Sequence, residues 1–314
     1  MQKNVRPAVA KQMSELSILI PTYNDICVNL VCDLHRCCMR VQNLTFEIIV
    51  AEDGSTSEES IASNKKIGTI GHCRHIIRNE NVGRAAIRNF LAQNARYDKL
   101  LFIDSHMSVI SDDFILRYLS YADNHPIVYG GYTIPKDVSA QPSNLRWKYE
   151  THCLHLQSAE TRSQEPYANF HTSNFIISKE VMLSHPLDER FKHYGYEDVL
   201  FGKTLLQAGI PILHIDNPVG FCRFESNERF VSKTEESIQT LHDFNNELIE
   251  YSRLAQLADR LRSLHLQTPL RFLFRLLSKS MRRHLTGQHP TLSIFNLYKL
   301  CYLLSSNQGD RLFD

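Results

Sequence analysis

The 314-residue sequence lacks several features, and each absence excludes a class of protein. Its eight cysteines do not show the spacing of a disulfide framework, and no Cys-x-x-Cys pair is answered by another at zinc-finger distance. The first residues lack the apolar core of a signal peptide, and no run reaches the roughly 20 apolar residues that cross a bilayer. Basic and acidic residues balance, 35 against 34, which gives no global argument for nucleic acid. We therefore expect free thiols and a cytoplasmic protein that does not bind nucleic acid.

What is present is an alternation of short apolar runs and helical patterns over the first hundred residues. Runs at 16–20, 46–51, 75–78 and 99–103 read as buried strands, and the apolar spacing over 26–38 and 84–95 is helical. This alternation predicts an α/β fold with a Rossmann-like, mostly parallel sheet flanked by helices. Ligands of such sheets bind at the carboxyl ends of the strands. Polar clusters follow three of these runs, at 22–24, 52–55 and 104–106, so we expect a site there.

The stretch Lys99 to His106 is the centre of this expected site. An apolar strand ends in Asp104, Ser105 and His106, which places two metal-ligand side chains one residue apart at an exposed strand end. Such a pair can hold a divalent cation on one side and leave the other side open to a diphosphate.

The remaining sequence is less regular. We expect strands over 126–133, 172–178 and 210–215, and helices over 144–158 and from Glu197 to Gly209. Ser232 and Glu235 form a capping box, which predicts a long helix reaching Leu264. A basic and apolar segment follows Pro269, and a last helix covers 294–304. The predicted organisation is a leader at 1–14, a catalytic domain at 15–225 and a helical C-terminal extension at 226–314.

The tail is basic: residues 260–314 hold nine Lys or Arg and two acids. Alternating basic and apolar residues are typical of a helix that lies in a membrane interface. A pair of helices packed on the catalytic domain, with solvated charges, explains the pattern equally well. Residues 269–314 therefore predict either peripheral contact with the inner membrane surface or simple packing.

Six motifs, in order and spacing, resemble those of inverting family 2 glycosyltransferases of the GT-A fold, of the type that builds bacterial polysaccharides and surface glycans. The resemblance spans roughly residues 15–216. The motifs are Ser17-Ile-Leu-Ile-Pro-Thr-Tyr-Asn24, Val50-Ala-Glu-Asp-Gly-Ser-Thr56, Asn79-Glu-Asn-Val-Gly-Arg-Ala-Ala-Ile-Arg-Asn89, Phe102-Ile-Asp-Ser-His106, Ser173-Asn-Phe-Ile-Ile-Ser178 and Tyr196-Glu-Asp198. The resemblance implies transfer of a sugar from a nucleotide-diphosphate donor to an acceptor hydroxyl, on a glycan or a lipid-linked molecule.

The resemblance also implies a donor site. Its residues would be Pro21, Thr22 and Tyr23 at the nucleoside, Asp53 accepting a hydrogen bond from the base, Arg84 near the diphosphate, Ser105, and Asn174 in the loop below the donor sugar. The ring N–H of uracil suits a carboxylate acceptor, so a UDP-sugar is the first expectation. Gly83 and Arg84 begin a helix, whose free N–H groups favour phosphate.

For the metal, Asp104 and His106 take the place of the family's Asp-x-Asp. Mn²⁺ or Mg²⁺ is implied, and the imidazole favours Mn²⁺. Many relatives carry a further histidine where this sequence has Phe221. Two protein ligands then suffice with diphosphate and water, or His214 or Cys222 substitutes.

On the acceptor side, Glu197 and Asp198 match the family's acidic pair. Inversion by a single displacement requires a carboxylate that takes the acceptor proton, and the position favours Asp198 as this base and Glu197 as a partner of an acceptor hydroxyl. Two other functions stay open at this stage. One is a non-catalytic protein that binds nucleotide-sugars or glycans; the other is a sugar nucleotidyltransferase, for which a Gly-rich basic loop after the first strand is missing.

Overall fold

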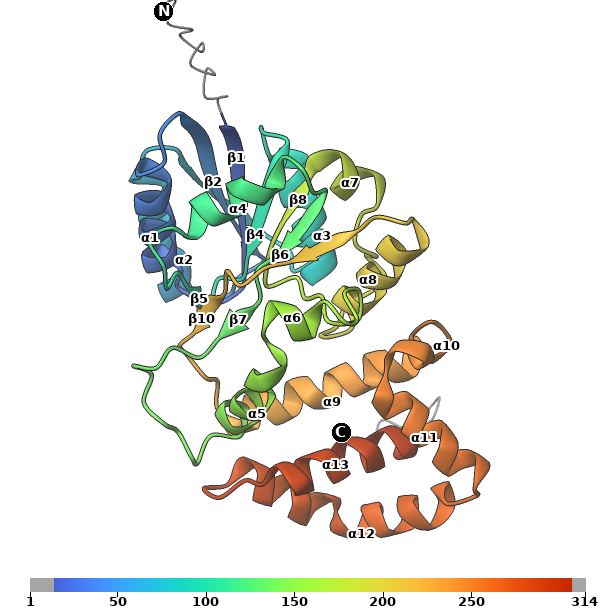
Figure 1. The fold of residues 1–314 in the computed structure, drawn as a ribbon. Helices are drawn as coiled ribbons and strands as arrows, with labels where there is room; N and C mark the ends of the chain where they lie inside the picture. Colours follow the sequence, from blue (N-terminus) through green and yellow to red (C-terminus); the bar gives the residue numbers. More distant parts are fainter. Residues whose placement is uncertain (1–13, 307–314) are drawn as a thin grey trace, which may run out of the picture.

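A computed structural model describes residues 14–306 and shows an α/β part with a group of helices below it (Figure 1). A seven-stranded sheet in the order β3-β2-β1-β4-β8-β6-β9 forms the centre of the α/β part. Its strands are β1 (Ser14–Thr22), β2 (Leu44–Asp53), β3 (Cys73–Arg78), β4 (Lys99–Ile103), β6 (Ile127–Tyr129), β8 (Asn174–Ser178) and β9 (Ile212–His214). The predicted leader, apart from Ser14, lies outside the described residues, and so does the end of the chain after residue 306.

The sheet is mostly parallel, as predicted. β1 pairs in parallel with β2 and with β4, and β3 continues the parallel half, whereas β8 runs antiparallel to both β4 and β6. Because β2 and β4 flank β1 on opposite sides, the chain reverses its direction of sheet growth between β1 and β4. Ligands of open α/β sheets bind at this kind of reversal, outside the carboxyl ends of the strands.

Helices cover both faces of the sheet, which explains why its strands are apolar on both sides. Leu16, Ile18 and Ile20 of β1 pack toward one helical layer, while Leu19 belongs to the core on the other face. The first layer contains α1 (Val28–Met39) and α4 (Phe114–Ala122); the second contains α3 (Arg84–Asn94), α7 (Lys179–Ser184) and α8 (Glu197–Gln207). The short α2 (Glu58–Asn64) connects β2 to β3.

A second sheet of three short strands corrects one prediction. The expected strand over 126–133 breaks into β6 and β7 (Tyr132–Thr133), and β7 joins β10 (Val219–Phe221) and β5 (Met107–Ser108). The break lies at Gly130 and Gly131: a Cβ on Gly130 would come within 2.3 Å of the Asn217 carbonyl oxygen, and Gly131 has a φ of +77°. The chain can therefore turn between the two sheets only with glycine at these positions.

The helical part also differs from the prediction. The helix expected from Ser232 begins earlier, at α9 (Asn227–Asp243), where the Ser226 side chain accepts a hydrogen bond from the Arg229 N–H, and it ends well before Leu264. The capping-box interpretation of Ser232 was wrong because Ser232 lies inside this helix. After α9 the chain forms α10 (Asn245–Leu248), α11 (Arg253–Ser263), α12 (Gln267–Thr286) and α13 (Leu292–Ser305).

Two apolar clusters attach the helical part to the rest. One joins Phe191 and Leu200, beside and within α8, to residues of α9, α11 and α13; in the other, Leu145 of α5 (Leu145–Cys153) packs on Phe230 of α9 and on side chains of α12 and α13. The loop from α5 to β8 also contains α6 (Ala159–Arg162). None of the helices within residues 14–306 is long and apolar enough to cross a membrane.

Candidate active site

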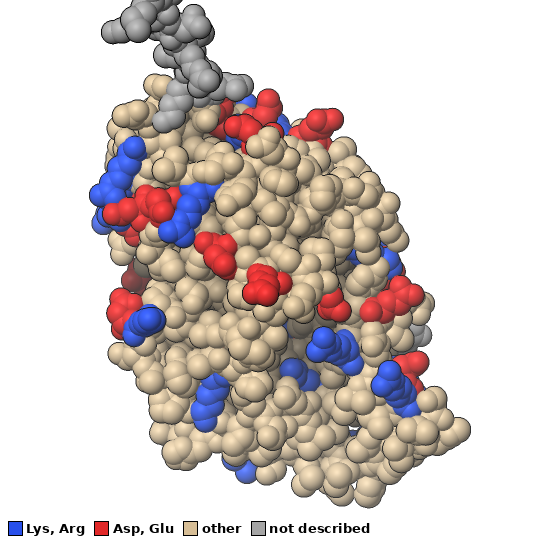
Figure 2. Space-filling model, viewed as in Figure 1, with Lys and Arg blue, Asp and Glu red and all other residues tan. Residues whose placement is uncertain are grey.

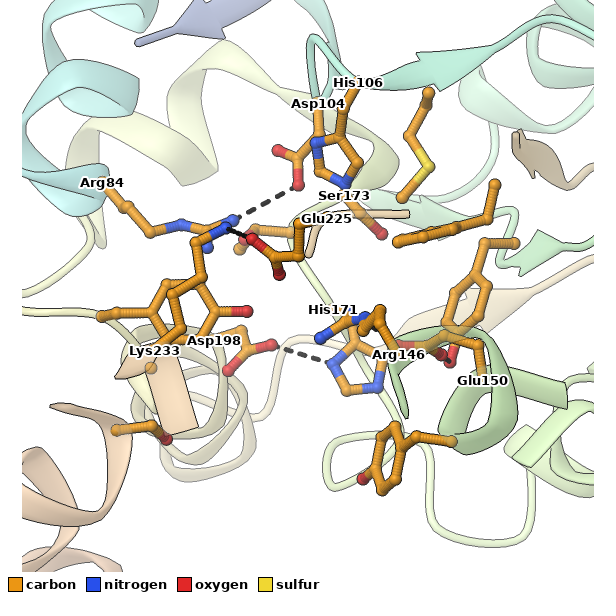
Figure 3. Close-up of a pocket in the computed structure, with 18 of the residues that line it drawn as sticks. Arg84, Asp104, His106, Arg146, Glu150, His171, Ser173, Asp198, Glu225 and Lys233 are labelled. Atoms are coloured by element: carbon orange, nitrogen blue, oxygen red, sulfur yellow. Dashed lines mark hydrogen bonds and ion pairs between the residues drawn. The ribbon is translucent and has the colours of Figure 1, made fainter. Parts of the chain in front are cut away.

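A cavity of about 740 Å³ opens at the carboxyl ends of β1 and β4, where the direction of sheet growth reverses (Figure 3). The N-terminus of α8 forms a second side, and α5 with α9 forms a third. The cavity brings together seven of the residues that the sequence singled out: Tyr23, Arg84, Asp104, Ser105, His106, Glu197 and Asp198.

Asp104, directly after β4, is held by two arginines of α3. Its Oδ1 lies 2.5 Å from a guanidinium nitrogen of Arg88, and its Oδ2 lies 3.3 Å from Arg84. Burial alone would raise the pKa of Asp104, but the two arginine charges outweigh burial and lower it. The carboxylate is therefore ionised at neutral pH, with the weaker of its two contacts on Oδ2.

His106 lies beside Asp104 at the same strand end, as Figure 3 shows. Burial lowers the pKa of His106 to about 4, so the imidazole is neutral at pH 7 and keeps a nitrogen lone pair. The ring meets Phe221 edge to face, with the centroids 5.4 Å apart. One anionic carboxylate and one neutral imidazole form a donor set that fits Mn²⁺. Among the described residues no group of three or more His, Cys, Asp or Glu side chains is placed to hold a metal, so two protein donors are what this corner offers.

The N-terminus of α8 presents the acidic pair. Tyr196, just before the helix, has a φ of +68°, and this turn directs Glu197 and Asp198 toward the cavity. A Glu197 oxygen lies 2.9 Å from Nε of Arg84, so Arg84 bridges Glu197 and Asp104. Burial raises the pKa of Glu197, and Arg84 offsets this only in part.

Asp198 has a different environment. Its Oδ2 lies 2.8 Å from Nδ1 of His171, and its Oδ1 accepts a hydrogen bond from the Val199 N–H (Figure 3). Burial raises the pKa of Asp198, but the hydrogen bond and charge of His171, with the charge of Arg84, outweigh burial and lower it. Adjacent carboxylates whose pKa values are shifted in opposite directions are typical of sites in which the two groups have different roles.

The end of β1 supplies an aromatic and a polar edge. Tyr23 is 43% exposed and lines the cavity, so its ring is free to pack on a ligand. Ser105 donates a hydrogen bond of 2.8 Å to Asp25, which also pairs with Arg223 at 3.2 Å. These contacts link the β1 and β4 ends into one surface.

Four predicted site residues lie outside the cavity lining: Pro21, Thr22, Asp53 and Asn174. The two oxygens of Asp53 accept hydrogen bonds from the N–H groups of Val82 and Gly83, which fixes the loop that enters α3. Asn174 is fully buried; it accepts a hydrogen bond from the Tyr118 hydroxyl and donates to the carbonyls of Gly131 and Asn217. Asp53 and Asn174 thus shape the site from behind, and their predicted contacts with a donor stay predictions.

His214 and Cys222, the possible substitutes for a third metal ligand, both lie outside the cavity lining. The structure places His214 in other contacts: its Nδ1 lies 3.1 Å from the Arg162 guanidinium and its Nε2 lies 2.9 Å from the Pro166 carbonyl oxygen. Arg162 itself is buried and donates to several carbonyls, so this pair ties the β6 and β9 ends together.

Several cavity residues were not found from the sequence. Arg88, which contacts Asp104 but does not line the cavity, had no assigned role. Three charged residues of the lining had none either: Glu150 in a predicted helix, Glu225 at the end of the predicted catalytic domain and Lys233 in the predicted extension. His171 lies in the polar loop before β8 and belongs to none of the six motifs. The one signal that could have drawn attention to His171 is its closeness to Ser173 and Asn174 in the sequence.

Comparisons with known proteins identify the family and the fold. A family model described as glycosyl transferase family 2 matches residues 17–183, just over half of the chain. The chain belongs to this family. Chondroitin synthase of Pasteurella multocida is 26% identical over 243 residues, which are 66% of this chain and 24% of that protein. This chain thus spans about a quarter of the length of that relative.

Two solved structures resemble the fold at low sequence identity. TarS of S. aureus in complex with UDP matches with a TM-score of 0.52 and 16% identity, covering 93% of this chain and 90% of that one. The mannosyltransferase PcManGT of Pyrobaculum calidifontis, in complex with GDP-Man and Mn²⁺, matches with a TM-score of 0.58 and 12% identity, covering 94% and 86%. The GT-A fold implied by the sequence motifs is confirmed.

Proposed function

We propose that this protein transfers a sugar, with inversion, from a nucleoside diphosphate donor, preferentially a UDP-sugar, to a hydroxyl of a glycan or lipid-linked acceptor. The observation that carries the proposal is the placement of an ionised Asp198, held by His171, in the same cavity as Asp104 and His106. This arrangement supplies a base on one side and a cation-binding corner on the other. The family membership and the TarS and PcManGT complexes with UDP and GDP-Man support a nucleotide-bound donor.

The reaction is a single displacement. The acceptor hydroxyl gives its proton to the carboxylate of Asp198 while its oxygen forms a bond to the anomeric carbon of the donor sugar. The bond from that carbon to the diphosphate oxygen breaks, and its electron pair leaves with the nucleoside diphosphate. Attack from the face opposite the leaving group inverts the anomeric carbon, and a base in hydrogen-bond reach typically contributes about 10² to 10⁴ in rate.

On the donor side we assign Tyr23 to the nucleoside base and Arg84 to the diphosphate. Arg84 is about one-third exposed and bridges Asp104 and Glu197, and its contact with Asp104 is long at 3.3 Å. An incoming diphosphate carries more negative charge than either carboxylate, so the guanidinium can turn toward it. The α3 N-terminus adds backbone N–H groups that favour an anion.

For the metal, Asp104 and His106 would hold Mn²⁺ or Mg²⁺, with the diphosphate and water supplying the other donors. When bound, the cation supplies Lewis-acid stabilisation of the charge on the departing diphosphate. The PcManGT complex, which contains Mn²⁺, favours this assignment.

The proposal is tested by donor turnover. UDP- and GDP-sugars are supplied with Mn²⁺, Mg²⁺ or a chelator, and release of the nucleoside diphosphate is measured. We expect turnover with at least one UDP-sugar and a large loss with chelator. Asp198→Asn, which keeps the side-chain shape, should lower transfer by at least about 100-fold while UDP binding by calorimetry stays near wild type.

Asp112→Asn is a suitable control, because Asp112 pairs with Arg40 on the surface, away from the cavity. Transfer by Asp198→Asn at the wild-type rate would contradict the assignment of the base. Release of no nucleoside diphosphate from any donor would contradict the enzymatic function itself.

We also propose that the enzyme contributes to polysaccharide biosynthesis at a membrane surface, which it contacts through α12. This helix leaves four large apolar side chains exposed, Phe272, Leu273, Leu276 and Leu277, between 44% and 66%. It contains no acidic residue, and Arg275 and Lys279 lie beside these apolar side chains on the helix surface. Figure 1 shows α12 at the outer edge of the helical part, away from the sheet. Exposed apolar and basic side chains on one helix favour an anionic lipid surface.

A further inference from the structure

The third side of the cavity comes from α5 and from the start of the helical part. The residues that line it are Arg146, Tyr149 and Glu150 of α5, Glu225 just before α9, and Arg229 and Lys233 of α9. Leu145, Phe230 and Val231 pack into an apolar cluster directly behind this wall. The α5–α9 wall is therefore a fixed part of the cavity, although it includes residues far beyond the stretch that matches the family model.

The charges on this wall are unbalanced. Arg146 and Glu150 form a matched ion pair with a separation of 2.6 Å, and Glu150 also accepts a hydrogen bond from the Tyr132 hydroxyl. By contrast, two cations share one oxygen of Glu225: Lys233 at 2.6 Å and Arg229 at 3.5 Å. The Arg229 side chain is 57% exposed, and no other acidic partner of Arg229 occurs within residues 14–306. One positive charge is thus left over on the α9 side of the cavity.

The wall shares the cavity with the donor-side residues and with Asp198. Figure 3 shows Asp104 and His106 at one side of the cavity and Asp198 with His171 at the other. The Lys233 ammonium lies 5.4 Å from the centre of the Tyr194 ring, and the Arg84 guanidinium lies 5.0 Å from the same ring. Tyr194 is therefore a shared neighbour of Lys233 and of the arginine that we assign to the diphosphate. Asp198, Lys233 and Arg229 line the same cavity, so an acceptor bound at Asp198 can extend toward the α5–α9 wall.

We propose that the α5–α9 wall is the acceptor-binding site and that Arg229 and Lys233 bind an anionic group of the acceptor, a carboxylate or a phosphate. The assignment rests on the proposed glycosyltransferase function and adds the chemical class of the acceptor. An incoming anion replaces the shared contact with Glu225 by a charge-assisted hydrogen bond of its own, and a partly enclosed wall strengthens such a bond relative to open water. Figure 2 shows a hollow in the lower half of the molecule with both basic and acidic side chains close to it.

The first test measures direct binding. Calorimetry compares an oligogalacturonate hexamer, its neutral methyl ester and a glycerol phosphate oligomer on the full chain in the presence of UDP. We expect the carboxylated or the phosphorylated oligomer to bind at least about tenfold more tightly than the neutral ester, and Arg229→Gln with Lys233→Gln to remove that difference. The two anionic probes distinguish the carboxylate from the phosphate source. The proposal is overturned if neither anionic oligomer binds more tightly than the neutral ester, or if no anionic probe binds.

The second test uses kinetics once a donor is found. We expect Lys233→Gln to raise the KM for an anionic acceptor about tenfold and to change the KM for the nucleotide-sugar much less. Added salt should raise the acceptor KM of the wild type more than that of the variant. Lys66→Gln, which changes an exposed lysine in the connection between α2 and β3, is the matched control. Turnover with neutral acceptors that is insensitive to Lys233→Gln overturns the acceptor assignment and leaves the proposed function standing. Absence of turnover with every donor contradicts the proposed function, and the binding test then still decides whether the wall binds an anion.

Discussion

At the scale of single residues, the contact between His171 and Asp198 is the feature with the most direct chemical consequence. The His171 ring lines the cavity and its side chain is 41% exposed, yet its Nδ1 is fixed by Asp198 at 2.8 Å. Burial lowers the pKa of His171, but the hydrogen bond and charge of Asp198 outweigh burial and raise it. Glu150 raises this pKa further and Arg162 lowers it. His171 therefore stabilises the ionised form of the carboxylate that we assign as the base.

Replacing this histidine should change the pH profile. Because His171 lowers the pKa of Asp198, His171→Ala should raise that pKa. The base works when ionised, so activity that is lost as the pH falls through the Asp198 pKa will be lost at a higher pH in the variant. The measurement is kcat against pH, with UDP affinity as a check of folding.

The same experiment distinguishes two roles for His171. A positioning role predicts residual activity in His171→Ala with the acidic limb shifted upward, and partial recovery in His171→Asn, which keeps a hydrogen-bond donor. If His171→Ala had the wild-type kcat and an unshifted acidic limb, the contact between His171 and Asp198 would have no role in activity. Loss of activity as complete as in Asp198→Asn would instead assign the proton-accepting role to His171.

At the scale of elements, α3 and β4 are joined by the pairing of Arg88 with Asp104. Arg88 is 1% exposed, and its guanidinium donates both to Asp104 and to the Arg84 carbonyl oxygen one turn earlier. This contact fixes the strand end that carries Asp104 and His106 against the helix that carries Arg84. The distance between Arg84 and the two residues that we propose to bind a cation thus depends on one buried side chain.

Removing that side chain should destabilise the fold. Arg88→Met keeps much of the volume but leaves the Asp104 carboxylate buried with only the long contact to Arg84. We expect a loss of about 3 kcal/mol in the free energy of unfolding, because a buried charge loses its partner. Urea denaturation followed by circular dichroism measures this loss.

Two further variants serve as controls for the stability of Arg88→Met. Arg117→Met removes an exposed pair with Asp113 on α4 and should cost no more than about 0.5 kcal/mol. Combining Arg88→Met with Asp104→Asn removes both charges, so part of the lost stability should return. An Arg88→Met variant as stable as the wild type would show that the pair does not hold α3 to β4.

At the scale of the whole molecule, the helical part contributes to two different surfaces. α9 contributes to the cavity, while α12 presents its apolar side chains to solvent on the far side of the same helical group. The buried residues of α12, including Phe274 and Leu285, pack on α9 and α13. Of the two sequence-based interpretations of this segment, packing on the protein therefore holds for one face, and membrane contact stays a proposal for the other.

The membrane proposal predicts a dependence on the apolar face of α12. Phe272→Ser with Leu276→Ser should reduce flotation with vesicles rich in anionic lipid several-fold, because burial of these side chains in the interface is lost. Wild-type protein should float less with neutral vesicles than with anionic ones. Leu116→Ser, which changes a 52% exposed leucine of α4, is the control. Equal flotation of all variants would contradict a role for α12, and a concentration-dependent dimer lost in the double variant would assign its face to a second copy instead.

Much of the α/β half could be predicted because its information is local. An apolar run flanked by polar residues fixes a buried strand and its end, so β1, β2 and β4 and the residues at their carboxyl ends follow from the sequence. The same kind of pattern places Glu197 and Asp198 at a helix start, and the family resemblance predicted them as site residues. The break at Gly130 was missed, since an apolar run does not reveal that the Asn217 carbonyl lies 2.3 Å from where a Cβ would stand.

The sequence by itself determined the fold class and the strand ends, because these depend on short patterns of polarity, and its motifs predicted seven of the residues at the cavity. The tertiary structure decided the partners: His171 beside Asp198, Arg88 on Asp104, both nitrogens of His214 in other contacts, and Lys233 of α9 at the cavity wall. These pairs are separated by many residues along the chain. Their charges and pKa values depend on burial and on neighbours within a few ångströms, which only the packed chain brings together.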